Sequence, residues 1–132
     1  MNALRRWLRA AMLAAALLLF ALTAGSGPAH AGPVNWQEVP ESPAGRQWWD
    51  KGSLRLSRDG ELSVLTRFQP ASEDRGQLYV MELDCGQKLY RDTSVNGLPR
   101  FKAEWQPTGG DDLISAVLDQ ACSAGSDLLA SR

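Results

Sequence analysis

Histidine and cysteine are the residue types that would first suggest chemistry in this chain, and both are scarce. The only histidine is His30, and the two cysteines are Cys85 and Cys122. Histidine is the commonest general base and metal ligand in proteins, so a chain that loses His30 loses both kinds of site. The spacing of the cysteines is far too wide for a Cys-x-x-Cys redox motif. We therefore expect no catalytic residue, no metal site and no cofactor.

Serines and carboxylates are the remaining candidates for catalysis. A serine triad needs a histidine partner, which the exported chain would lack. Paired carboxylates can perform acid–base chemistry or bind calcium, but no EF-hand spacing is present. Asp59 fits a turn and Asp111 fits a helix cap, so an uncatalogued hydrolase is only a remote alternative. The residues considered are Ser53, Ser57, Ser63, Asp59, Glu61, Glu73, Asp74, Asp111 and Asp112.

Residues 1–31 have the layout of a secretory signal peptide. Three arginines precede a largely apolar run at 10–24, and residues 29–31 supply the small side chains that a signal peptidase reads. A membrane-spanning helix needs about 20 apolar residues, which is more than this run offers. We expect cleavage before Gly32, with cleavage after Ala24 or Ala29 as alternatives, and no membrane anchor afterwards.

The remaining residues, 32–132, are expected to form a single domain. The chain holds 14 basic and 15 acidic residues, and three of the basic ones lie in the leader, so the remainder carries 11 − 15 = −4. This mild acidity argues against nucleic acid as a partner. Two cysteines in an exported chain usually form one disulfide, so we expect Cys85 and Cys122 to be bonded.

Alternating patterns predict short antiparallel strands. Leu54 and Leu56 alternate with polar residues, and the pair at 59–60 suits a tight hairpin. Cys85 falls on the more apolar face of its strand, where a helix would dock, whereas Arg91 and Asp92 are expected to be solvated. The predicted strands are 34–39, 46–50, 53–57, 61–69, 77–85, 87–93 and 100–105.

One amphipathic helix should follow the strands. Asp111 is a good N-cap, and apolar residues then recur on one helical face that includes Leu118 and Cys122. A disulfide from this face would fix the helix across the sheet, and residues 125–132 are expected to be a frayed tail. The prediction is an α+β fold: an antiparallel meander of about six strands with one C-terminal helix tied to the sheet.

The order of several short motifs resembles the surface-adhesin protein E-like family of small exported bacterial proteins. The motifs are Trp36, an aromatic pair ending in Asp50, "KGSLRLSRDGELSV", "ELDC" at 82–85, "KLYR" at 88–91, "AEW" at 103–105 and a helix ending in Cys122. The resemblance covers most of residues 32–132. It implies an antiparallel sheet with a C-terminal helix held by the two cysteines, and it implies no enzymatic activity.

Tryptophan is abundant outside the leader, at Trp36, Trp48, Trp49 and Trp105. Tryptophan is enriched where binding energy concentrates, but it also fills small cores. Because Trp48 and Trp49 are adjacent on a strand, they must point to opposite faces of the sheet. We expect one of them to be core and the other to be a candidate contact for a partner.

These observations predict an exported, non-enzymatic binding protein of the bacterial envelope with an unidentified protein partner. Free sheet edges would also allow a homodimer. The alternative is an assembly or protection factor for an envelope or photosynthetic-membrane complex. The expected location is the periplasm or cell surface, or the thylakoid lumen if the source is photosynthetic.

Overall fold

The computed structural model describes residues 3–4, 6–7 and 32–132. The apolar run and the cleavage site of the expected leader therefore lie outside the described residues, as does His30, and the leader stays a prediction. Within the described ranges, no helix is long and apolar enough to cross a membrane. The description below concerns Gly32–Arg132, which groups as one unit.

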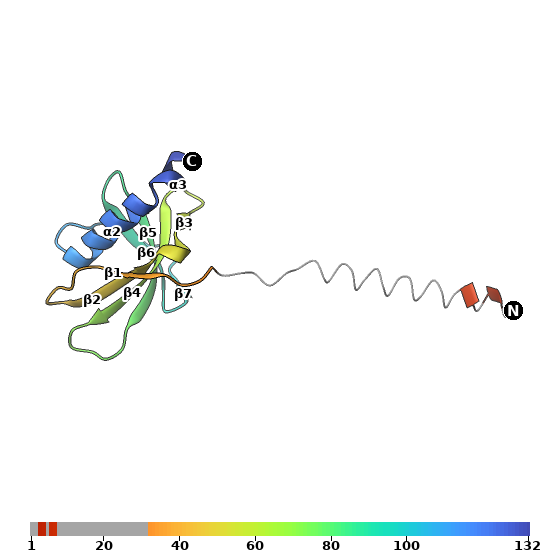
Figure 1. Cartoon of the computed structure of the whole chain (residues 1–132), viewed down its shortest axis with the longest axis horizontal. Helices are drawn as coiled ribbons and strands as arrows, with labels where there is room; N and C mark the ends of the chain where they lie inside the picture. Colours follow the sequence, from red (N-terminus) through yellow and green to blue (C-terminus); the bar gives the residue numbers. More distant parts are fainter. Residues whose placement is uncertain (1–2, 5, 8–31) are drawn as a thin grey trace. The chain divides into compact units, whose positions relative to one another are not determined.

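Short strands joined by tight turns build one antiparallel sheet (Figure 1). Its order is β1-β2-β4-β5-β6-β7, while β3 also pairs with β4 and β8 with β6. This confirms the predicted antiparallel meander. The strands are β1 (Trp36–Glu38), β2 (Gly45–Asp50), β3 (Arg55–Leu56), β4 (Leu62–Pro70), β5 (Gln77–Asp84), β6 (Leu89–Val95), β7 (Leu98–Pro99) and β8 (Gln106–Pro107).

Helix α2 (Asp112–Ala124) covers one face of this sheet, which we call the inner face. Asp111 caps α2, because its carboxylate accepts a hydrogen bond from the Ile114 backbone N–H at 3.0 Å. The core forms where alternate residues of the strands pack against the apolar stripe of the helix. Its buried apolar members are Val39, Trp49, Leu62, Val64, Met81, Leu83, Leu113, Val117, Leu118 and Ala121.

The predicted disulfide is present between Cys85, just after β5, and Cys122, near the end of α2. The two Cα atoms are 5.9 Å apart, within the range that a disulfide spans without backbone movement. Both cysteines pack against the core. The bond therefore fixes the C-terminal part of α2 to the sheet, as the sequence indicated.

The strand predicted at 53–57 is shorter than expected. A 3-10 turn, η1 (Lys51–Ser53), interrupts the chain, and only Arg55–Leu56 pairs with β4. The Ser53 hydroxyl replaces a backbone partner, because it accepts a hydrogen bond from the Leu65 N–H at 2.8 Å. The chain from β2 to β3 thus follows the edge of β4 in two pieces.

The prediction of a strand at 100–105 was wrong. Asn96 and Gly97 both have positive φ, which makes a tight turn and returns the chain to β6 at Leu98–Pro99. The chain then leaves the sheet and rejoins it only at Gln106–Pro107. The alternation at 101–105 does not bury a face, since Phe101 is 91% exposed.

The C-terminal tail is ordered, which corrects the prediction that residues 125–132 are frayed. Helix α3 (Ser126–Ala130) follows Gly125, and Leu129 packs against the core. The Arg132 guanidinium donates a hydrogen bond to the Gly60 carbonyl at 2.8 Å. The tail is therefore held against the β3–β4 hairpin.

The tryptophan pair divides between the two faces of β2, as strand geometry requires. Trp49 is 4% exposed in the core, and its indole N–H donates to the Gln120 side chain of α2 at 2.9 Å. Trp48 is half-buried and lies opposite Arg67 of β4. Trp49 therefore links sheet and helix, whereas Trp48 belongs to the other face.

Reducing the disulfide should destabilise the fold without abolishing it. The bond closes a loop of 37 positions, and the chain-entropy model gives such a closure roughly 4 kcal/mol of stability. Urea unfolding with and without reductant, and of Cys122→Ser, should show a loss of that size or less. Finding two free thiols in the native oxidised protein would contradict the bond itself.

The tryptophans should differ sharply in their effect on stability. Trp49→Ala leaves a cavity and an unpaired Gln120, so we expect a loss of about 3–5 kcal/mol in the free energy of unfolding. Trp48→Ala removes only contacts on the outer side, so about 1–2 kcal/mol is expected. Chemical denaturation measures both values. Equal losses for the two variants would show that Trp48 is also core.

Candidate functional site

The face of the sheet opposite α2, which we call the outer face, carries an aromatic and cationic cluster. The guanidinium carbons of Arg46 and Arg67 lie 4.9 Å and 5.2 Å from the centroid of the Trp48 ring. Leu78, which pairs with Arg67 across the β4–β5 ladder, is 42% exposed. The result is a tryptophan in cation–π contact with two arginines, next to an exposed apolar side chain.

Glu38 on β1 fixes one of these arginines. The Arg46 guanidinium donates two hydrogen bonds to the Glu38 carboxylate, at 2.7 Å and 2.9 Å. These bonds hold the pKa of Glu38 below its usual value. Arg67 is exposed and lies near Gly76. Arg46 is thus bound to a carboxylate, whereas Arg67 lies in solvent. Both arginines contact the Trp48 ring.

A second cluster on the same face surrounds one arginine of β6, Arg91. The Arg91 guanidinium donates hydrogen bonds to Glu82 at 2.7 Å and to Asp59 at 3.0 Å. It also lies 4.4 Å from the centroid of the Trp105 ring. The prediction that Arg91 is solvated was wrong, because both carboxylates and the ring enclose it. Asp59 fulfils the predicted turn position and contributes this ion pair as well.

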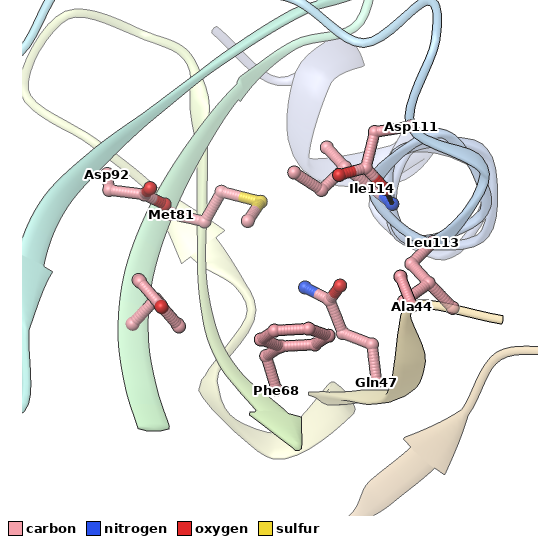
Figure 2. A pocket seen from close by; sticks show the side chains of 9 residues that line it. Ala44, Gln47, Phe68, Met81, Asp92, Asp111, Leu113 and Ile114 are labelled. Carbon is pink, nitrogen blue, oxygen red and sulfur yellow. Dashed lines mark hydrogen bonds between the residues drawn. The ribbon is translucent and has the colours of Figure 1, made fainter. Parts of the chain in front are cut away.

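A cavity of about 210 Å³ lies between α2 and the inner face (Figure 2). The loop before β2, strands β2, β4, β5 and β6, and the first turn of α2 each contribute to its wall. The lining is mainly apolar, with a few polar groups. It consists of Ala44, Gln47, Phe68, Tyr79, Met81, Asp92, Asp111, Leu113 and Ile114.

Two polar side chains of the sheet, Gln47 and Asp92, line this cavity. Gln47 is 3% exposed. Figure 2 shows its amide beside the Phe68 ring, directed into the cavity. One carboxylate oxygen of Asp92, Oδ1, is buried without a partner among the described residues. Buried polar atoms are normally hydrogen-bonded, so this oxygen of Asp92 requires an explanation.

Burial raises the pKa of the Asp92 carboxyl above its ordinary value of 3.8, and the Arg100 guanidinium partly opposes this effect. Tyr79, whose hydroxyl donates to the Gln77 side chain, also has a raised pKa because of burial and the nearby Asp92. The prediction that Asp92 is a solvated strand residue was therefore wrong. It lies opposite the buried Met81 in the β5–β6 ladder and so faces the core side.

The acidic residues and serines singled out in the sequence do not come together as a site. Within the described ranges, no group of three or more histidine, cysteine or acidic residues could hold a metal ion. Asp111 caps α2, Ser53 bonds to the backbone, and Glu61 lies 3.8 Å from Arg132. Sequence reasoning missed Gln47 and Asp92, which are polar residues at inward-facing strand positions.

The raised pKa of Asp92 should appear in the pH dependence of stability. A carboxyl with a raised folded-state pKa binds its proton more tightly when folded, so the free energy of unfolding falls as pH rises above 3.8 and through the raised value. Asp92→Asn removes this dependence. Urea unfolding across this range should show the variant gaining stability relative to the parent as pH rises. A constant difference would contradict the raised pKa.

Of the comparisons with known proteins, one gives a match, and it is to a protein family. No curated protein and no solved structure is similar enough to this chain to count as a match. A family model described as the Surface adhesin-E family matches residues 37–128. The matched segment runs from β1 into α3 and contains both cysteines. The chain therefore belongs to the Surface adhesin-E family.

Proposed function

We propose that this protein is an exported, non-enzymatic binding protein of the bacterial envelope, which holds a protein partner on its outer face through Trp48. Membership of a surface-adhesin family supports an extracytoplasmic binding role. The disulfide supports the same location, because such bonds persist in oxidising compartments. The Trp48 cluster is the observation that carries the proposal.

Trp48 has the properties of a residue that concentrates binding energy. Tryptophan and arginine are the residue types most enriched among such positions. Arg46 and Arg67 flank the ring, so its orientation is set before a partner arrives, and less side-chain entropy is lost on binding. Arg67 in solvent and Leu78 alongside favour a partner surface that combines acidic and apolar groups.

The sheet edges support a homodimer less well than the outer face supports a different partner. The outermost strands β1 and β7 contain three and two residues, and β8 pairs along another part of β6. Such short edges leave few backbone groups for strand addition. A second copy of the chain therefore stays an outcome to be tested.

An assembly or protection factor is the second candidate function, because it would use the same surface. The two roles differ only in the partner that Trp48 contacts. A component of an envelope or photosynthetic-membrane complex would indicate the assembly role, and an extracellular ligand would indicate adhesion.

Affinity capture with matched variants tests the proposal. The oxidised protein is used to recover partners from envelope extract and, separately, from extracellular material. We expect Trp48→Ala and Arg67→Glu to weaken capture of the same partner, with a loss of about 2 kcal/mol or more, roughly 30-fold in Kd, for a central contact. Binding of the purified partner by calorimetry gives the number.

Phe101→Ala is the matched control, because it removes an aromatic ring that is 91% exposed in a loop. It should leave the affinity unchanged. Equal capture by the parent and Trp48→Ala would refute the proposed surface. If the molecular mass of the parent in solution rises with protein concentration and that of Trp48→Ala does not, the partner is instead a second copy of the chain.

A further inference from the structure

We propose that the cavity beneath α2 binds a small organic cation with an apolar body, of the arylalkylamine class. The site is separate from the outer face and does not depend on the proposed partner. The argument uses the shape of the cavity, its polar groups and the charges that line it.

The apolar wall sets the body of the ligand. Phe68 and Met81 come from the sheet, and Leu113 and Ile114 come from the first turn of α2 (Figure 2). The cavity measures about 210 Å³, whereas pockets for drug-sized ligands usually measure about 300–1,000 Å³. A single ring with a short chain is therefore the scale of molecule that the cavity fits.

The polar groups of the lining set how the ligand is held. Gln47 is 3% exposed, and Figure 2 shows its amide directed into the cavity. The buried Asp92 Oδ1 has no hydrogen-bond partner among the described residues. Proteins keep such costly groups mainly where a ligand or ordered water completes them. A ligand with several N–H donors would satisfy both the amide oxygen and the carboxylate.

The charge of the lining selects a cation. Asp92 and Asp111 are both in the wall, and no lysine, arginine or histidine is among the lining residues. Asp111 accepts the Ile114 N–H as the cap of α2, whereas Asp92 Oδ1 has no partner among the described residues, so Asp92 is the carboxylate that we assign to the ligand. Arg100, which lowers the pKa of Asp92, lies with Lys102 in the wall of a neighbouring hollow that Asp92 also lines. An ammonium group would therefore be attracted, and a carboxylate ligand would be repelled.

Titration with 2-phenylethylamine tests the site on the oxidised protein by NMR. We expect a saturable shift of the Met81 and Ile114 methyl signals. 3-Phenylpropionate and 2-phenylethanol, which keep the ring but replace the ammonium, should bind at least about tenfold more weakly, the scale of one charge-assisted hydrogen bond.

Variants separate recognition from general effects on folding. Asp92→Asn should weaken 2-phenylethylamine binding by about tenfold or more, and the near-isosteric Gln47→Met should weaken it too. Asp112→Asn, an exposed neighbour outside the lining, should leave the affinity unchanged. If Gln47→Met fails to fold, Asp92→Asn still decides the question.

Three results would overturn the proposal: no saturable shift, equal affinity for either uncharged or anionic analogue, or unchanged affinity in Asp92→Asn. None of these results bears on the role of Trp48, because that side chain lies on the other face of β2. A loss of partner capture in Trp48→Ala would likewise leave the cavity proposal standing.

Discussion

The docking of α2 on the inner face of the sheet is the interaction on which the rest of the structure depends. The sheet alone would expose a row of apolar side chains, and the helix supplies the complementary stripe that buries them. Two further links fix its position: the Cys85–Cys122 bond near its end and the Trp49–Gln120 hydrogen bond. Both links lie beyond the first turn of α2, which is held by its Asp111 cap, by packing and by the Ser115 hydroxyl, which donates to the Thr108 carbonyl at 2.8 Å.

The cavity lies beside this first turn of α2. Leu113 and Ile114 of the first turn form one wall, while Gln47 and Asp92 form polar parts of the sheet side. Replacing Asp92 with an apolar residue of similar volume would cost little, because its buried Oδ1 has no partner among the described residues. The sequence instead keeps polar side chains in the wall of this cavity, which supports the proposed binding role.

The sequence predicted the parts of the fold that follow from local periodicity. The alternation through Leu62 and Val64, the cap at Asp111 and the disulfide are all present as expected. The segment 100–105 failed because an alternating pattern states which side chains share a face but not whether another element covers that face. Gln47 and Asp92 failed for a related reason. Their inward direction depends on strand register, which the local pattern of residue types does not determine.

The alternation of β2 also separates the two candidate sites by charge. Gln47 and Trp49 point inward, and Arg46 and Trp48 point outward, so a single strand serves both faces. The outer face presents arginines around an aromatic ring, whereas the cavity presents carboxylates without a lining cation. One ligand chemistry cannot suit both. An acidic partner surface would match the outer face and be rejected by the cavity, and a small ammonium ion would match the cavity and be repelled by Arg67. The two surfaces can therefore act in the same molecule without competing for the same ligand.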